Sequence, residues 1–459
     1  MKKKHDSGHK TTFAEKLAWG AGGMTESLVN CIYSLSFPIF SISLGVSASL
    51  VGLAQSLPRM IDAFTDPLMG SISDNTRTRF GRRRPYILIG AIGCGLIVPL
   101  IFRPNPGWSE HVLFAWLLSL TIVFFLFFTV WSIPWSALGL EMSDDYNDRT
   151  SLQVTRMVFA TIAQIAISWA YKLCFYFDKN ELIGVRSVTL IVGGIMFGGG
   201  VLSALFIKEW RKTSNQAKLN LLSAVKMTLR NRPFLLVCCT VLFFAGGVIV
   251  VEPMLLYVNI HHVYDGARAP ASTIMGISGT VGVITTVLLL PLGGWLSSKV
   301  GKRHAAYIAL SLIVVGKGSQ YFLVTPNHPY LQIISRIIFQ PGIMLMWALV
   351  PSMIADICDL DELQTGARRE AVFSAVYQWI WKLGATLAVA LAGTLLTFFG
   401  ADSIAPGVKL DAGTIQNLRI SLAIVPPLFG VLAFLCIWKY PLTAEKIQEI
   451  KEQKNAIPN

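Results

Sequence analysis

The chain has 459 residues, of which 53% are hydrophobic and only 14% are charged. Because soluble domains carry about 25% charged residues, this composition excludes an ordinary soluble protein and indicates an integral membrane protein. The net charge of +13 is distributed over alternate loops, a pattern typical of membrane topology, and this argues against nucleic acid as a partner.

Apolar segments long enough to cross a bilayer recur along the whole chain. A run of about 18 or more mostly apolar residues is typical of a transmembrane helix. We identify twelve such segments, so the sequence predicts an all-α membrane protein. They cover residues 14–44, 50–74, 85–103, 110–141, 150–177, 187–209, 233–262, 272–299, 304–324, 329–357, 371–400 and 416–440.

Lysine and arginine are concentrated in every second loop and at the N-terminus. The basic side chains are Lys2, Lys3, Lys4, Lys10, Arg77, Arg79, Arg82, Arg83, Arg84, Arg211, Lys212, Lys218, Lys226, Arg230, Lys299, Lys302, Arg303, Arg368 and Arg369. Cytoplasmic loops carry such an excess, so we expect both termini in the cytoplasm and the chain in the plasma (inner) membrane. The N-terminus lacks the pattern of a cleaved signal peptide.

The spans fall into two groups of six. We predict an N-terminal bundle at 1–209, a cytoplasmic linker at 210–232, a C-terminal bundle at 233–440 and a cytoplasmic tail at 441–459. Within the linker, 219–229 has the apolar spacing of a helix on the membrane surface. The loop "GSISDNTRTRFGRRR" after the second span is repeated as "GGWLSSKVGKRH" after the eighth, which indicates an internal repeat.

Enzymatic motifs are missing from the sequence. It contains no GxSxG, HExxH, P-loop or CxxC pair, and the seven cysteines lie in or beside apolar segments. We therefore expect a protein that is not an enzyme and has no cofactor.

The duplicated loop resembles the signature of the major facilitator superfamily. The segment "DAFTDPLMGSISDNTRTRFGRRRPYIL" resembles more narrowly the glycoside–pentoside–hexuronide:cation symporters. The segments Ile133–Ala160 and Ala355–Gly384 agree with that family. The resemblance implies the major facilitator fold, with twelve helices in two bundles around a central cavity. It also implies symport of a sugar or glycoside with Na⁺ or H⁺ by alternating access, by a protein that functions as a monomer in membrane lipid.

Two carboxylates interrupt the second span. Asp62 and Asp66 share one helix face, and at about 1.5 Å per residue they lie roughly 18 and 12 Å from Asp74 at the helix end. Acids inside the bilayer are costly and mutually repulsive, so a bound cation, a proton or a structural partner must compensate them. The resemblance implies a coupling-cation site of Asp62, Asp66 and Thr129. Thr65 replaces an asparagine of one family member, which leaves Na⁺ and H⁺ both open.

Further polar and aromatic side chains lie inside the predicted spans. The resemblance matches Lys382 and Arg156 to cavity and substrate positions; structural pairing and snorkelling to the interface are the alternatives. The predicted substrate-binding set is Glu26, Arg156, Trp135, Lys382, Ser132, Tyr377 and Gln378. Glu26 and Ser132 stand where a sugar-binding family member has other residues, so a lysolipid or other amphiphile is an alternative cargo.

Charged residues at the cytoplasmic ends of the spans form a predicted inner gate. Salt bridges between the bundles would hold that gate closed, and solvated charges are the alternative. The gating set is Asp74, Arg82, Arg149, Asp356, Asp359 and Arg368. Glu252, Lys317 and Arg336, toward the other side, are interpreted as gates, ligands or outer-leaflet salt bridges.

Overall fold

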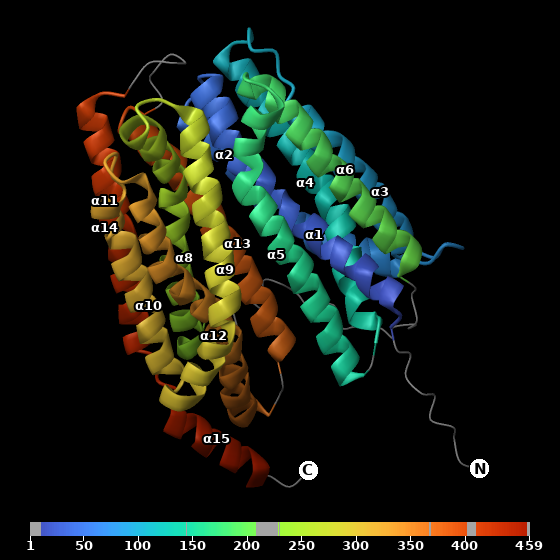
Figure 1. The fold of residues 1–459 in the computed structure, drawn as a ribbon. Helices are drawn as coiled ribbons and strands as arrows, with labels where there is room; N and C mark the ends of the chain where they lie inside the picture. Colours follow the sequence, from blue (N-terminus) through green and yellow to red (C-terminus); the bar gives the residue numbers. More distant parts are fainter. Residues whose placement is uncertain are drawn as a thin grey trace. The chain divides into compact units, whose positions relative to one another are not determined.

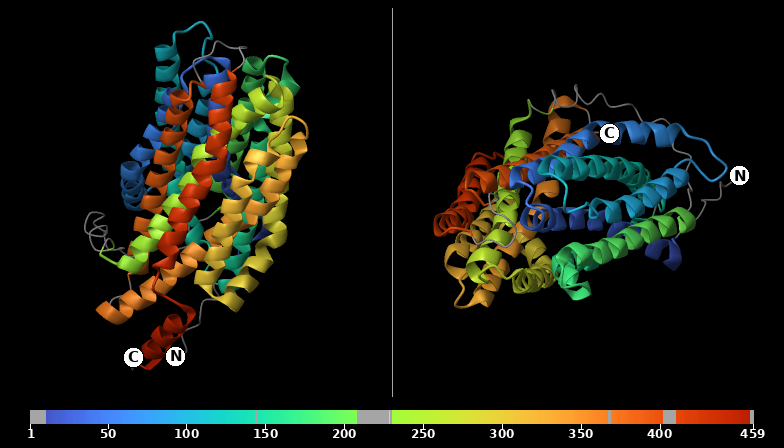
Figure 2. Two further views of the ribbon diagram at one scale, coloured as in Figure 1. Left: turned by 90° about the vertical axis from the view of Figure 1, so that its left-hand side faces the viewer. Right: turned by 90° about the horizontal axis from the view of Figure 1, so that it is seen from above.

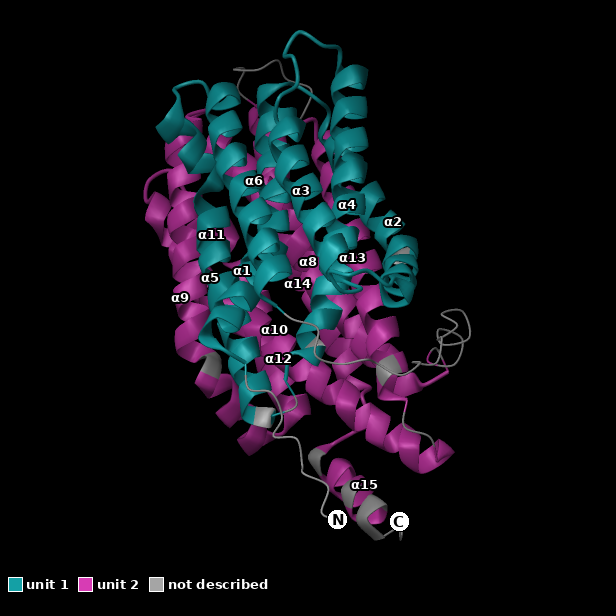
Figure 3. Ribbon diagram, turned by 90° about the vertical axis from the view of Figure 1, so that its right-hand side faces the viewer, with its two compact units in different colours: residues 1–216 teal, residues 217–459 magenta. Residues whose placement is uncertain are grey.

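The structure is a computed structural model that describes residues 11–143, 145–207, 228, 230–366, 369–401 and 410–456. Regular structure in these ranges is entirely helical (Figure 1). The chain divides into two compact units, residues 1–216 and 217–459, which Figure 3 shows in two colours.

Unit 1 contains six long helices. They are α1 (Phe13–Ser36), which continues into the π-helix η1 (Phe37–Ser43), α2 (Ala48–Asn75), α3 (Arg84–Ile101), α4 (Glu110–Glu141), α5 (Tyr146–Phe177) and α6 (Glu181–Phe206). Side chains fix several of their ends. Thr12 and Glu15 form a capping box at the start of α1, and Asn180 caps α6, which satisfies backbone N–H groups that have no partner within the helix.

Unit 2 also contains six long helices, together with shorter ones. They are α8 (Arg232–Val258), η2 (Asn259–Val263), α9 (Arg268–Val300), α10 (Lys302–Gly318), α11 (Gln320–Leu323), η3 (Pro329–Leu331), α12 (Gln332–Thr365), α13 (Glu370–Phe398), α14 (Ala412–Trp438) and α15 (Ala444–Ala456). Asp411 is the N-cap of α14. Hydrogen bonds from the side chain and the backbone N–H of Thr414 hold the pKa of the Asp411 carboxyl below its usual value.

Each of the twelve predicted spans corresponds to one long helix. Within the described residues, ten helices are long and apolar enough to cross a membrane by length and composition. The polar residues of α1 and α2 keep these two below that threshold. The largest differences from the prediction are that α6 begins earlier, α12 runs on to Thr365, and α15 occupies the predicted tail. The predicted surface helix at 219–229 lies almost entirely outside the described residues.

The two units repeat one packing order. In unit 1, α1 packs on α5 and α6, α3 on α4 and α6, and α2 on α4. In unit 2, α8 packs on α13 and α14, α10 on α12 and α14, and α9 on α12 (Figure 2). Because helices at the same place in each half make the same contacts, the repeat seen in the loop sequences extends to the architecture of both units.

Candidate functional site

The acid pair of α2 meets a hydroxyl of α4. Thr129 Oγ1 lies 3.3 Å from Asp62 Oδ1 and 3.1 Å from Asp66 Oδ1, within reach of a hydrogen bond that the hydroxyl donates to either carboxylate. Asp62 and Thr129 are buried, with 6% and 2% of their surface exposed. The two aspartates share a helix face because they are four residues apart, and packing of α2 on α4 brings Thr129 to that face.

This arrangement provides carboxylate and hydroxyl oxygens to one small volume. Hard cations prefer oxygen ligands. In the described part of the chain, no group of three or more His, Cys, Asp or Glu side chains could hold a metal ion. Two carboxylates with a neutral hydroxyl suit a monovalent cation, or a proton, better than a divalent ion that prefers a larger set of oxygen ligands.

Arg59 is a neighbour of this pair that the sequence analysis missed. Its Nε donates to Tyr33 Oη at 2.7 Å, and its guanidinium lies 4.8 Å from the centre of the Tyr33 ring. Arg59 precedes Asp62 by three residues, so both lie on the same side of α2. That spacing is the signal that identifies it in the sequence.

Arg156 of α5 forms a bidentate pair with Glu26 of α1. The Arg156 Nη2–Glu26 Oε2 distance is 2.7 Å, and the Nε–Oε2 distance is 3.1 Å. About a third of each side chain is exposed, 32% for Arg156 and 35% for Glu26. Both are therefore accessible to a ligand, and the pairing replaces the predicted alternative in which Arg156 snorkels to the interface.

Glycines of α1 make room for this pair. A Cβ at Gly23 would lie 2.7 Å from Arg156 Cγ, and one at Gly22 would lie 2.3 Å from Trp135 Nε1. The sequence "GAGG" in α1 thus allows the α5 arginine and the α4 tryptophan to approach its backbone.

Trp135 lies in a stack of indole rings. Its ring centre is 4.2 Å from that of Trp19 and 5.0 Å from that of Trp131, and the Arg156 guanidinium lies 5.3 Å from it. Trp135 is fully buried. The ring packs against the Arg156 guanidinium, and a contact between Trp135 and the substrate stays a prediction.

The other predicted substrate residues lie on α4 and α13. Ser132 is half-buried on α4, whereas α13 carries Tyr377 buried, Gln378 exposed and Lys382 half-buried. Trp347 of α12 was missed: it is 37% exposed, and its ring packs edge-on against Trp381. An apolar pattern on all sides of α12 conceals which of its faces is open.

The duplicated loops make equivalent bonds at one end of each unit. Arg82 bonds Glu141 at the end of α4 at 2.6 Å, and Lys302 bonds Asp356 of α12 at 2.5 Å. The backbone of Trp438 at the end of α14 accepts a hydrogen bond from Arg303. Arg84 likewise donates to the carbonyl oxygens of Ala204 and Leu205 at the end of α6, and basic groups there complement the helix dipole.

These bonds place several predicted gating residues inside single units. Asp74 pairs with Arg83 at 2.7 Å, and Arg149 donates to the Ser143 carbonyl at 2.6 Å. Asp359 is half-buried on α12, and Arg368 lies outside the described residues. Gating by pairs between the bundles stays a prediction, while Asp74, Arg82 and Asp356 have partners within their own bundle.

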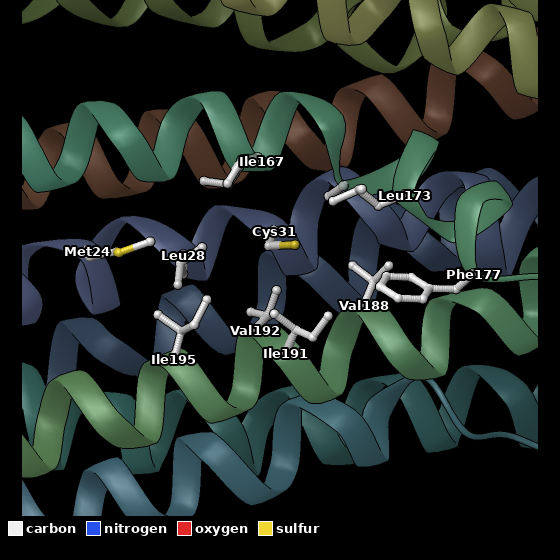
Figure 4. Close-up of a pocket in the computed structure, with 12 residues that line it drawn as sticks. Met24, Leu28, Cys31, Ile167, Leu173, Phe177, Val188, Ile191, Val192 and Ile195 are labelled. Atoms are coloured by element: carbon white, nitrogen blue, oxygen red, sulfur yellow. The ribbon is translucent and has the colours of Figure 1, made fainter.

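A separate pocket in unit 1 is apolar. It has a volume of about 80 Å³ and opens among α1, α5 and α6, where the labelled side chains point toward a common space (Figure 4). Its lining is Met24, Leu28, Cys31, Ala166, Ile167, Ala170, Leu173, Phe177, Val188, Ile191, Val192 and Ile195. This lining suits a hydrocarbon chain and offers almost no partner to a sugar hydroxyl.

Comparisons with known proteins place the chain among transporters. The family model described as MFS/sugar transport protein matches residues 18–444. The chain is 26% identical to an uncharacterized symporter of Bacillus subtilis over 97% of its own length and 96% of that protein. It is 24% identical to the isoprimeverose transporter of Lactiplantibacillus pentosus, covering 94% and 91%. The nucleoside transporter NupG shares the fold, with a TM-score of 0.69 at 14% identity, over 93% of this chain and 100% of NupG.

Proposed function

The chain belongs to the family of MFS/sugar transport proteins, and on that premise we propose that it is a cation-coupled symporter of a sugar or glycoside. A relative is named as a symporter and another as the transporter of a sugar. The protein is a multi-pass membrane protein of the major facilitator fold.

The contact of Thr129 with both carboxylates carries the proposal. Without a cation, two acids inside a bilayer repel each other and are poorly solvated. A Na⁺ ion bound to Asp62, Asp66 and Thr129 would neutralise one charge and satisfy the oxygens, and a proton would relieve the repulsion in a different way. Binding of a cation or a proton at this site therefore changes the free energy of the bundle, and such a change is what couples ion binding to a transport step.

The Arg156–Glu26 pair is our proposed anchor for the cargo in unit 1. A guanidinium donates to sugar hydroxyls and a carboxylate accepts from them, and both groups are accessible. Within unit 2 itself, we propose Lys382, Gln378 and Trp347 as substrate-binding residues. Transport would occur by alternating access, with the basic loop ends and both termini in the cytoplasm, in the plasma membrane and as a monomer.

The proposal is tested by uptake into proteoliposomes with a panel of labelled sugars and one lysolipid. An imposed Na⁺ gradient, or a proton gradient in choline, should drive accumulation of a sugar. Asp66→Asn should lower that accumulation at least tenfold, because it removes one charge of the cation site. Asp178→Asn, in the loop before α6, is the control and should transport normally.

Two other results of the uptake experiment would change the proposal. Concentrative uptake that survives Asp66→Asn would remove the cation site from the mechanism. Accumulation of the lysolipid alone would replace the sugar with an amphiphile and leave the coupling intact.

A further inference from the structure

Three charged side chains of unit 2 meet away from the residues assigned above. Lys317 of α10 donates to Glu252 Oε1 of α8 at 2.9 Å. Arg336 Nη1 of α12 lies 3.7 Å from the same oxygen, beyond hydrogen-bond length. The cluster thus combines two cations with a single carboxylate and carries a surplus positive charge.

The energetic cost of this surplus positive charge depends on how deeply the cations are buried. Lys317 is completely buried, and Arg336 is 25% exposed. Transfer of a charge out of water is unfavourable unless an opposite charge compensates it. Among the described residues, one carboxylate shared by two cations leaves the cluster with a net positive charge.

The contacts indicate which of the two cations Glu252 neutralises less completely. Lys317 has the closer bond to Glu252 and also lies in the last turn of α10, where the helix dipole favours a cation. Arg336, beyond the first turn of α12, has only the longer contact with Glu252. Within the described part of the chain, Arg336 Nε is buried without a hydrogen-bond partner.

Packing holds the Arg336 side chain in place. A Cβ at Gly282 of α9 would lie only 2.6 Å from Arg336 Nε, so this glycine leaves space for the guanidinium. The ring centre of Phe339 lies 5.1 Å from the guanidinium on the same helix. Glu252 is 40% exposed, which opens one side of the cluster to a ligand.

We propose that Arg336, beside Lys317 and Glu252, forms a binding site for a monovalent anion. A guanidinium binds a carboxylate through two parallel N–H groups and also binds a spherical halide. The ligand is therefore a carboxylate-bearing solute or an inorganic anion such as chloride. The statement that this anion is a carboxylate of the transported solute rests on the proposed function. The anion site itself does not rest on it.

The test measures the melting temperature of the full-length purified protein in halide-free HEPES buffer. Choline chloride, choline glucuronate and, as the uncharged match of glucuronate, glucose are titrated separately, so that no Na⁺ is added to the proposed cation site. An anion that binds the folded protein raises the melting temperature by mass action. Arg336→Gln should weaken the apparent affinity for the effective anion at least tenfold, and Arg336→Lys should weaken it less.

Two further variants make the test independent of general destabilisation. Glu252→Gln removes the competing carboxylate and should tighten anion binding at least threefold, the opposite direction to Arg336→Gln. Arg419→Gln is the matched control, since Arg419 of α14 also lies near an aromatic ring, that of Tyr321, and has a buried Nε without a partner. It should leave anion binding unchanged.

The two possible ligands give different results. Stabilisation by glucuronate and not by chloride or glucose assigns the site to a carboxylate, and stabilisation by chloride assigns it to an inorganic anion. Equal stabilisation of the wild type and Arg336→Gln by every anion, or no stabilisation of the wild type, overturns the proposal. Because these titrations need no transport, cation-driven sugar uptake can succeed or fail independently of them.

Discussion

At the scale of single residues, Thr129 joins the two acids of α2. Thr129→Ala removes the hydroxyl and leaves two carboxylates without their shared partner. The proposed cation site then loses one of its oxygen ligands, so cation affinity should fall roughly tenfold, which corresponds to about 1.4 kcal/mol. Titration of the cation against melting temperature measures this change.

The conservative variant separates ligand loss from packing. Thr129→Ser keeps the oxygen and should retain cation affinity within about threefold. If Thr129→Ala and Thr129→Ser weaken the cation equally, the missing methyl group and not the hydroxyl is responsible, and Thr129 is not a ligand.

The residues of the site differ in how well the sequence predicts them. The relation of Asp62 to Asp66 is local, so helix geometry alone places them together. The Arg156–Glu26 pair joins residues 130 positions apart, and no local pattern predicts such a contact. The burial of Trp135 escaped prediction because α4 is apolar on nearly every side, and its periodicity does not identify the inward face.

At the scale of elements, the duplicated loop depends on its glycine. Gly301 joins α9 to α10 with a φ of 78°, where a side chain strains the backbone. Gly301→Ala should destabilise the protein by about 1–3 kcal/mol and lower its melting temperature. The bond from Lys302 to Asp356 should weaken with it.

A second glycine in the same segment gives the opposite expectation. Gly294 lies inside α9, and a Cβ there would meet no atom within 4 Å. Gly294→Ala should therefore leave stability unchanged or raise it by up to about 1 kcal/mol, since alanine favours a helix. Equal losses for both variants would contradict the role assigned to the Gly301 backbone.

The helices themselves are largely predictable because a membrane span needs length and apolar character more than precise signals. Ten of the twelve spans meet that requirement in the described part of the chain, whereas α1 and α2, which carry polar residues, fall below it. The added turns of α12 follow less directly, because a helix continues past the bilayer until a residue ends it. Gly366, with φ of 70°, ends α12 after Thr365, eight residues beyond Ile357, the last residue of the predicted span.

At the scale of the whole molecule, the repeat gives each bundle the same internal contacts but different functional groups. Unit 1 contains the acid pair and the Arg156–Glu26 pair. Unit 2 contains the cluster of Glu252, Lys317 and Arg336. A symporter requires that cation and cargo favour the same conformations, so we expect the two ligands to act through coupling between the sites.

This coupling is reciprocal and can be measured. If saturating Na⁺ lowers the Kd of the sugar by a factor of about 5–150, saturating sugar must lower the Kd of Na⁺ by the same factor. Calorimetric titration of each ligand, with and without the other, gives both factors. In Glu26→Gln, sugar affinity should fall while Na⁺ affinity measured without sugar stays unchanged, because Glu26 is absent from the cation site. If Glu26→Gln lowers both affinities, Glu26 belongs to one site shared by the sugar and Na⁺. If the two Kd ratios of the wild type are unequal, one of the titrations measures a process other than binding of its ligand.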